Sequence, residues 1–330
     1  MPIHHPADAI FLDTPGGPEA LACRTTSVAA PGPGEVLIRQ TAIGVNFHDI
    51  YVRSGLYRTL ALPGIPGIEA AGIVEAVGEG VTSLKPGDRV GYVTDQYGAY
   101  TTRRTLPAAL ALPLPTTLED IPAASCLLKG MTAAVLISRA YRVKPGDTIL
   151  VHAAAGGVGQ LLCRWAKHLG ARVIATVGSR DKALTATTAG ADHVIFYREE
   201  DFVAQTLALT GGNGVSAVYD AVGRDTFAGS LDCLDYLGTL VNYGQASGPI
   251  EPISPSALAT RSLTLVRPML FHYLRRPGEL AETAGDLFNA LSTGFIAPPP
   301  PTIFPLSAAG EAHRYLESRA ATGSVVLLPE

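Results

Sequence analysis

A regular alternation of strands and helices between residues 148 and 244 is the feature that most restricts how this chain can fold. Strand-like apolar runs such as "TILVHA" (148–153) and "ARVIATV" (171–177) are separated by amphipathic stretches such as "VGQLLCRWAKHLG" (158–170). Strands joined through helices of this length form a parallel sheet that has helices on both faces. We therefore expect a doubly wound parallel sheet in this part of the chain.

The residues on either side of this region follow a different pattern. Short strand-like runs broken by glycine and proline, such as "EVLIRQTAIGVN" (35–46) and "LKPGDRVGYV" (84–93), fill the first third of the chain. Short strands at such close spacing are typical of a compact β barrel. After residues 264–271 the alternation gives way to a long helix, a proline-rich segment, and a final helix and strand. A chain of 330 residues is long enough for two domains.

Charge and hydropathy exclude several functional classes. The net charge is −4, and no basic run exceeds the arginine pairs at 103–104 and 275–276, so we expect no nucleic-acid-binding surface. No apolar stretch is expected to reach the roughly 18 residues of a membrane span, and the first ten residues do not resemble a signal peptide. The four cysteines are far apart and are expected to be buried and reduced. These features predict a cytoplasmic protein.

The segment "VHAAAGGVGQ" (151–160) carries the clearest functional signal. It lies between a predicted strand and a predicted helix, where dinucleotide-binding proteins have the pattern G-x-G-x-x-G. Gly156 and Gly159 hold the second and third glycine positions, and Ala154 replaces the first. Without a Cβ atom the backbone can approach a pyrophosphate, and the N–H groups of the helix that begins near Gly157 and Val158 point at the phosphates. The turn is therefore expected to bind a dinucleotide.

The residues after the second strand of this region distinguish the two nicotinamide coenzymes. NAD sites usually place an acidic residue there for the ribose 2′-hydroxyl, but this chain has Val177 and Gly178. Two cations, a hydroxyl and a tyrosine follow instead: Ser179, Arg180, Lys182 and Tyr197. This combination suits a 2′-phosphate, so we predict NADPH rather than NADH. The alternative is that both cations are solvated charges, although cations at a helix start oppose its dipole.

Six motifs together resemble those of one enzyme family. They are "VNFHDIYVRSGLY", "GIEAAGIVEAVGEGV", "KPGDRV", "HAAAGGVGQ", "YDAVGRDTF" and "LESRAATGSVVL". From about residue 35 to residue 328 the chain resembles quinone oxidoreductases, the zinc-free branch of the medium-chain dehydrogenase/reductase superfamily. The resemblance implies a GroES-like β-barrel catalytic domain of residues 1–128 and 267–330 and a Rossmann domain of residues 129–266. It also implies a homodimer paired through the Rossmann domain, and hydride transfer from NADPH to quinones or α,β-unsaturated carbonyl compounds.

The same resemblance argues against a catalytic metal. Zinc-dependent relatives have a cysteine where this chain has Asn46, and a Gly-His-Glu triplet where it has Gly67, Ile68 and Glu69. Zinc needs at least three well-placed ligands, and the eight histidines are dispersed along the chain. We therefore expect no metal. The substrate must then accept a hydride without a Lewis acid, as quinones and conjugated enones do.

The resemblance also assigns site residues one at a time. Asn46, Tyr51 and Tyr57 are the expected catalytic residues: Asn46 would donate an amide N–H to a carbonyl oxygen, and the tyrosines would shape the quinone pocket. A tyrosine can also donate a hydrogen bond or the proton that the reduced acceptor takes up. Plain packing is the alternative for the tyrosines, and solvent can equally supply that proton. Besides the glycine turn and residues 178–182 and 197, the expected coenzyme contacts are Asn46, Phe47, Asp49, Thr132, Tyr243, Gly244, Gln245, Met269, Leu270, Phe271 and Arg319.

Two other functions stay open from the sequence. One is NADPH-dependent reduction of the C=C bond of enals or enones, which only the shape of the pocket distinguishes from quinone reduction. The other is an NADPH-binding protein with little turnover, like the crystallin-like and RNA-binding members of the superfamily. The low positive charge argues against RNA, and the catalytic residues named above argue for chemistry. His48, in the same motif, is expected to be half-exposed and turned away from the pocket; the alternative is that this titratable group alters the pH dependence or the choice of substrate.

Overall fold

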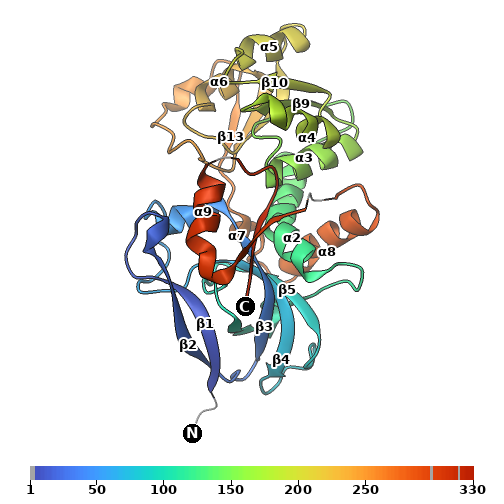
Figure 1. Cartoon of the computed structure of the whole chain (residues 1–330). Coiled ribbons are helices and arrows are strands. Elements are labelled where there is room, and N and C mark those ends of the chain that lie inside the picture. The colour runs from blue at the N-terminus through green and yellow to red at the C-terminus, as the bar shows by residue number, and fades with distance from the viewer. Residues whose placement is uncertain (1–3, 298–299, 319) are drawn as a thin grey trace. The chain divides into compact units, whose positions relative to one another are not determined.

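The computed structural model describes residues 4–297, 300–318 and 320–330. The chain forms two compact units, of which the first contains residues 1–128 and 298–330 and the second contains residues 129–297. In the first unit the C-terminal strands, coloured red, lie beside strands from the start of the chain, coloured blue (Figure 1).

The first unit is built mainly from antiparallel strands. Its strands are β1 (His4–Leu12), β2 (Leu21–Ala29), β3 (Glu35–Val45), β4 (Glu69–Val77), β5 (Arg89–Val93), β6 (Arg103–Pro107), β7 (Leu112–Pro113), β14 (Thr302–Pro305) and β15 (Val325–Leu328). Its helices are α1 (Phe47–Arg53) and α9 (Ala309–Glu317). The sheet order is β14-β15-β3-β4-β5-β7 with β6 also paired to β3, and β1 and β2 form a separate hairpin.

Strand β15 completes this sheet from the far end of the chain. It pairs antiparallel with β3, so that Val325 lies opposite Val45. The β-branched residues Val36, Ile38 and Ile43 of β3 belong to one buried cluster, as expected for a central strand that is covered on both sides. The first unit therefore needs both ends of the chain, and the β architecture expected for them is confirmed.

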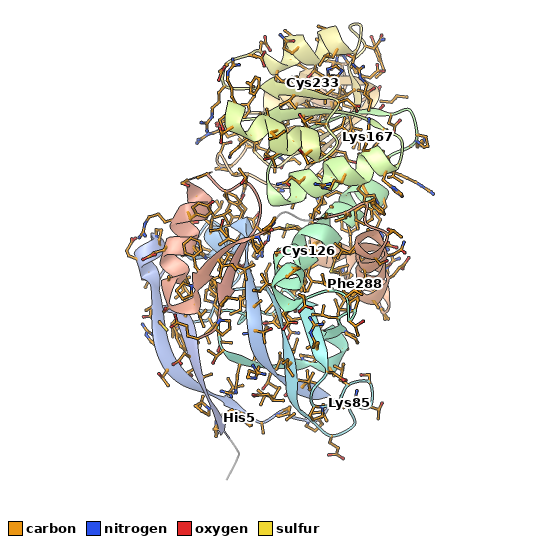
Figure 2. All side chains as sticks on the ribbon, turned by 45° about the vertical axis from the view of Figure 1, so that its right-hand side comes forward. His5, Lys85, Cys126, Lys167, Cys233 and Phe288 are labelled. Carbon is orange, nitrogen blue, oxygen red and sulfur yellow. The ribbon has the colours of Figure 1, made fainter. Side chains whose placement is uncertain are left out.

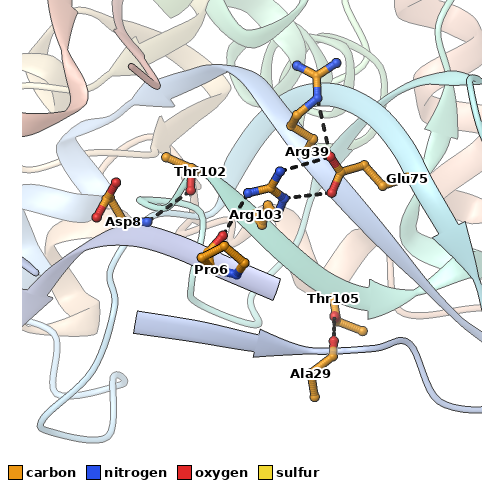
Figure 3. A network of polar contacts seen from close by, with 8 residues as sticks. All are labelled: Pro6, Asp8, Ala29, Arg39, Glu75, Thr102, Arg103 and Thr105. Carbon is orange, nitrogen blue, oxygen red and sulfur yellow. Dashed lines mark hydrogen bonds and ion pairs between the residues drawn. The ribbon is translucent and has the colours of Figure 1, made fainter. Parts of the chain in front are cut away.

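Side chains of β6 attach the N-terminal hairpin to the sheet (Figure 3). Arg103 donates from Nε to Glu75 at 2.8 Å and from Nη1 to the Pro6 carbonyl at 2.8 Å. Thr105 Oγ1 donates to the Ala29 carbonyl on the second strand of the hairpin at 3.0 Å. An open polar hollow of about 410 Å³ lies beside this hairpin, and none of the candidate site residues lines it.

The second unit is a parallel sheet covered by helices. Its strands are β8 (Thr148–Val151), β9 (Arg172–Val177), β10 (His193–Phe196), β11 (Val215–Asp220), β12 (Leu234–Asn242) and β13 (Thr264–Val266). Its helices are α3 (Gly157–His168), α4 (Ala183–Thr188), α5 (Phe202–Leu209), α6 (Phe227–Asp232), α7 (Leu270–Tyr273) and α8 (Glu279–Ser292). The strand order is β10-β9-β8-β11-β12-β13, with all strands parallel. The chain adds strands on one side of β8 and then on the other, which is the Rossmann arrangement.

Both faces of this sheet are buried. Ile149 and Val151 of β8 join a cluster that includes Leu161 and Leu162 of α3, whereas Leu150 joins a second cluster that includes Phe227 of α6. Alternate residues of one strand thus face opposite layers of helices, which explains the nearly continuous apolar character of the strands. The expected doubly wound parallel sheet is confirmed.

Residues 267–297 belong to the second unit in the structure, whereas the family resemblance implied a boundary at 267. Ala290 of α8 and Ile296 join the buried cluster around β8 and α3. Leu287 of α8 packs against Gly130, where an added Cβ atom would lie 2.4 Å from the leucine Cδ1. These contacts of α8 with the Rossmann core explain why the compact unit extends to residue 297.

Helix α2 (Asp120–Val135) continues as a π-helical turn over Leu136–Ala140. This 21-residue helix is long and apolar enough to cross a membrane by length and composition, which corrects the expectation that no apolar stretch reaches such a length. Because 72% of its most apolar window is buried inside the protein, it has the character of a core helix.

None of the four cysteines forms a disulfide bond, but they are not all buried. Cys126, Cys163 and Cys233 are buried, and Figure 2 labels the first and last of them within the side-chain packing of their units. Cys23 is exposed on strand β2 of the hairpin. The expectation of burial is therefore wrong for Cys23, because the hairpin that carries it is covered on only one face.

Candidate active site

Asn46 and Asp49 form the N-terminus of helix α1. Asn46 is the N-cap residue in extended conformation, and its backbone N–H donates to Asp49 Oδ2 at 2.8 Å in a capping box. The Asp49 carboxylate lies in the first helical turn, where the helix dipole favours negative charge. The motif "VNFHD" thus places Asn46 at the junction between β3 and α1, with its side chain buried.

A buried carboxylate orients the Asn46 amide. Asn46 Nδ2 donates to Glu69 Oε2 at 2.8 Å, and the backbone N–H of Leu128 donates to Glu69 Oε1 at 2.7 Å. Glu69 is 0% exposed. A Cβ atom at Gly44 would lie 2.3 Å from Glu69 Oε2, so the glycine makes room for the carboxylate. Sequence reasoning considered Glu69 only as part of an absent zinc motif and missed this contact, because no local pattern links residues 46 and 69.

Asp49 is also connected to helix α9. Tyr100 Oη donates to Asp49 Oδ2 at 3.1 Å and lies 2.9 Å from His313 Nε2. Tyr100 and His313 are both fully buried, and burial lowers the pKa of His313 to about 3. Arg53, at the end of α1, donates to the Glu317 carboxylate at 2.9 and 2.6 Å. Helix α1 is therefore fixed at both ends.

The aromatic residues of the α1 motif lie together. Tyr51 and Tyr57 meet edge to face with ring centroids 5.2 Å apart, and Phe47 lies 6.1 Å from Tyr51. The His48 ring lies 5.5 Å from the Tyr57 ring. His48 has the intermediate exposure that was expected, its ring lies against Tyr57, and burial lowers its pKa to about 4.

In the second unit, the glycine turn connects β8 to α3. Gly156 is the N-cap of α3, and its N–H donates to the Ala153 carbonyl at 2.9 Å. A Cβ atom at Gly159 would lie only 2.3 Å from that carbonyl oxygen, so this position requires glycine. The left-handed residue of the turn is Ala153 (φ 52°), and Ala154, at the missing glycine position, is buried without positive φ. The replacement of the first glycine is thereby accommodated.

A side chain that the sequence did not single out stabilises this turn. Gln160 Nε2 donates to the Ala155 carbonyl at 2.7 Å, and Gln160 is buried. The amide thus satisfies a backbone acceptor just before the helix starts, where backbone groups otherwise lack partners. In the sequence, the glutamine that ends the motif "HAAAGGVGQ" could have indicated this contact.

The predicted phosphate-binding residues follow strand β9. Arg180 is exposed, forms an ion pair with Glu199 at 2.7 Å, and lies 4.9 Å from the Phe196 ring centroid. Ser179 hydrogen-bonds Asp181 and thereby lowers the pKa of that carboxyl. Lys182 follows directly in the same short turn.

Two residues after strand β10 adjoin this segment. A Cβ atom at Gly178 would lie 3.4 Å from the Tyr197 hydroxyl and 3.5 Å from Arg198 Nε. Because β9 and β10 pair in parallel with Val177 opposite Phe196, the residues after them emerge at one edge of the sheet. Arg198 is therefore a further cation beside Gly178 that sequence reasoning missed, although its neighbour Tyr197 was predicted.

The ends of β11 and β12 form the next part of this edge. The buried Asp220 carboxylate accepts from the N–H groups of Val222 (2.7 Å) and Gly223 (3.1 Å). The Tyr243 N–H donates to the Asp220 carbonyl at 2.9 Å. Gly244 is packed so closely that a Cβ atom would lie 2.6 Å from the Ala221 carbonyl oxygen. Asp220 thus organises the loop beside the predicted coenzyme residues Tyr243, Gly244 and Gln245.

The remaining predicted coenzyme residues are placed as follows. Thr132 is half-buried on α2, Met269 is the N-cap of α7, and Leu270 and Phe271 are its first residues. Arg319 lies outside the described residues. Within residues 4–297, 300–318 and 320–330, no three His, Cys, Asp or Glu side chains gather as a metal site would require.

Comparison with known proteins identifies relatives of this chain. Residues 32–116 match the family model for the alcohol dehydrogenase GroES-like domain, and residues 157–288 match the model described as zinc-binding dehydrogenase. A 2-haloacrylate reductase from a Burkholderia species is 43% identical over 98% of this chain and 99% of that protein. Quinone oxidoreductase 1 of Escherichia coli is 44% identical over 95% of this chain and 97% of that protein. The crystal structure of Escherichia coli quinone oxidoreductase complexed with NADPH matches with a TM-score of 0.95 at 43% identity, covering 98% of this chain and 100% of that one.

Proposed function

Because the chain belongs to the quinone oxidoreductase family of the medium-chain dehydrogenases and reductases, we propose that it is an enzyme that reduces quinones with NADPH. The observation that carries this proposal is the Asn46 amide, held by the buried Glu69 carboxylate beside the tyrosines of α1. An oriented amide donor next to an aromatic surface suits a flat acceptor whose oxygen gains negative charge during the reaction.

The second unit supports NADPH as the coenzyme. The glycine turn and the start of α3 would hold the pyrophosphate, and Ser179, Arg180, Lys182, Tyr197 and Arg198 would hold the 2′-phosphate. The ion pair between Arg180 and Glu199 does not oppose this assignment. Both side chains are largely exposed, and such a pair contributes at most about 1 kcal/mol. A phosphate dianion can therefore compete with Glu199 for the guanidinium.

We assign the acceptor to residues of the first unit. Bound NADPH supplies the hydride. Asn46 donates an amide N–H to the acceptor oxygen. Because Glu69 accepts from the Asn46 Nδ2, it fixes the orientation of the amide group. Tyr51 and Tyr57 pack against the acceptor ring, and Asp49 holds the backbone of Asn46 in place. Because the charge on a reduced quinone or enone is delocalised, these groups need only orient the acceptor and stabilise its oxygen.

Reduction of an activated C=C bond is the second candidate. The 43% identity with a 2-haloacrylate reductase over nearly the full length of both chains favours it. The same oriented amide would then stabilise the enolate oxygen of an α,β-unsaturated carbonyl compound.

We further propose that the two compact units correspond to a catalytic and a coenzyme-binding domain and that the protein is a cytoplasmic homodimer. Support for pairing comes from the second unit, where β13 forms one edge of the sheet and Tyr236 and Leu237 of β12 are 74% and 75% exposed. Large exposed apolar side chains beside a sheet edge are typical of an interface. Buried cysteines that form no disulfide bond are in keeping with a reducing compartment.

The test is NADPH consumption, followed by absorbance, with 1,4-benzoquinone, a simple enone and 2-chloroacrylate, in the presence of EDTA and with NADH in parallel. We expect turnover of the quinone with NADPH that the chelator does not change and that Asn46→Ala lowers. Turnover of 2-chloroacrylate without turnover of the quinone would establish the second candidate. Tight NADPH binding without turnover of any acceptor would refute both.

A further inference from the structure

A chain of three hydrogen-bonded side chains adjoins the predicted acceptor tyrosines. His48 Nε2 lies 2.8 Å from Tyr97 Oη, and Thr59 Oγ1 lies 2.5 Å from the same hydroxyl. The three residues come from α1, from the loop that follows it (residues 54–68) and from the loop after β5. The network therefore joins three segments of the first unit that are distant in sequence.

His48 lies between Tyr97 and Tyr57. Its ring is stacked on Tyr97 with centroids 5.9 Å apart and an interplanar angle of 24°, and it meets Tyr57 edge to face at 5.5 Å and 69°. Tyr57 in turn meets Tyr51 edge to face. Tyr57 is thus supported on one side by Tyr51 and on the other by a histidine whose position depends on Tyr97.

The backbone of Tyr97 is itself held from the interior. Arg104 is only 7% exposed, and its guanidinium donates to the carbonyls of Tyr97 (3.0 Å) and Gln96. The same guanidinium lies 4.9 Å from the ring centroid of Tyr92, which is fully buried. Tyr97 is therefore a fixed attachment point rather than a side chain on a freely moving loop.

The loop of residues 54–68 is attached through its backbone mainly at its two ends; near the second end, the Gly67 carbonyl accepts from the Gly98 and Ala99 N–H groups at 3.1 Å. The Tyr57 N–H donates to the Tyr51 carbonyl at 2.9 Å, and Gly64 pairs with Leu12 through two backbone hydrogen bonds of 2.8 and 3.0 Å. Between these points the Thr59 hydroxyl bonds Tyr97. The bond from Thr59 to Tyr97 therefore fixes the middle of a loop that begins next to Tyr57.

From this geometry we infer that His48 and Tyr97 are positioning residues for the hydride acceptor, because the Thr59–Tyr97–His48 chain holds Tyr57 against it. The inference rests on the proposed function, in which Tyr57 packs against the acceptor ring. Without these hydrogen bonds Tyr57 and its loop are mobile, so that binding the acceptor includes the free-energy cost of ordering them. Coenzyme binding, whose phosphate contacts are assigned to the second unit, does not change.

The side chains of the Thr59–Tyr97–His48 network are uncharged at neutral pH. Burial lowers the pKa of His48 to about 4 and raises the pKa of Tyr97. A neutral imidazole nitrogen and two hydroxyls can each donate or accept, so the bonds form in either direction. Phenylalanine at position 48 or 97 keeps an aromatic ring for packing but removes the hydrogen bond.

The test compares steady-state kinetics of Tyr97→Phe, His48→Phe, His48→Gln and Thr59→Val with the wild-type protein. We expect Tyr97→Phe, His48→Phe and Thr59→Val each to raise the KM for 1,4-benzoquinone roughly three- to tenfold, which corresponds to one neutral hydrogen bond. The kcat and the KM for NADPH should stay within about twofold. His48→Gln should restore a KM near that of the wild type, since its amide can bond Tyr97. Tyr141→Phe, which removes a tyrosine hydroxyl that donates to Asp147 in the second unit, is the matched control.

Hydrogen exchange without coenzyme or acceptor separates this inference from the proposed function. Tyr97→Phe should accelerate amide exchange in residues 54–68 and leave the second unit unchanged, even if the wild-type protein reduces no quinone. An inactive wild-type protein whose loop shows this acceleration would refute the function and retain the network. Unchanged exchange in the loop, an unchanged quinone KM in an active enzyme, or failure of His48→Gln to restore the KM would overturn the inference.

Discussion

Mild acid should weaken the first unit through one buried histidine, His313 of helix α9. The Tyr100 hydroxyl has a single hydrogen, which it donates to Asp49, so its 2.9 Å contact with His313 uses the imidazole Nε2–H as donor. The other nitrogen, Nδ1, is buried and has no hydrogen-bond partner among the described residues. Protonation would place a second N–H and a positive charge there. Burial and the nearby Arg53 cation therefore lower the pKa of His313 to about 3.

The sign and size of the effect follow from linkage. Because the folded-state pKa lies below the ordinary value of 6.5, the unfolded chain binds more protons between these values. The stability is complete above about pH 6.5 and is lost as the pH falls toward 3. Between pH 7 and pH 5 this single group should lower the free energy of unfolding by about 2 kcal/mol, and by pH 4 by about 3 kcal/mol.

The assay is urea unfolding at pH 7 and pH 5 for the wild-type protein and His313→Gln. Glutamine can donate to Tyr100 but does not titrate. His48 and His152 also have lowered pKa values, yet they are present in both proteins, so the difference isolates His313. A thiol-labelling pulse read by mass spectrometry reports each unit separately, since Cys126 is buried in the first and Cys163 in the second.

We expect Cys126 to become accessible at a lower urea concentration at pH 5 than at pH 7. The loss in free energy of unfolding between these pH values, read at Cys126, should be about 2 kcal/mol smaller in His313→Gln than in the wild-type protein. Cys163 should show the same pH response in both proteins. An equal loss of free energy of unfolding at Cys126 in the two proteins would refute the argument, since the acid sensitivity would then come from other groups.

Four further substitutions test the sites of both units. Gly159→Ala should destabilise the second unit by about 1–3 kcal/mol, because its Cβ atom would meet the Ala153 carbonyl oxygen at 2.3 Å. Gly156→Ala, whose Cβ atom would lie 3.1 Å from the same oxygen, should change the urea midpoint of the second unit little. Arg198→Ala should raise the KM for NADPH about tenfold and leave the KM for NADH unchanged, because it removes one charged phosphate contact; equal effects on both coenzymes would exclude that contact. Glu69→Gln should lower kcat/KM for the quinone about tenfold by loosening the Asn46 amide, and an unchanged kcat/KM would show that the amide needs no fixed orientation.

Several parts of the candidate site were not predictable from the sequence. Glu69 meets Asn46 because β4 pairs with β3, and Arg198 reaches Gly178 because β10 lies beside β9. The loop after β5 brings Tyr97 to His48, a contact that no local pattern indicates. Each of these contacts joins residues that are at least 20 positions apart. A local pattern records which residue types are present, but not which of them will be neighbours.

The sequence by itself determined the features that depend on local periodicity and backbone chemistry. Alternating strands and helices required a parallel sheet, and the segment 151–160 predicted a tight turn before a helix with glycine where a Cβ atom has no room. Only the tertiary structure decided that β15 closes the sheet next to β3, that α8 packs with the Rossmann core, and that His313 is buried without a partner for Nδ1. The physical reason is that these outcomes depend on burial and pairing between distant segments, whose free energy no single stretch of the chain contains.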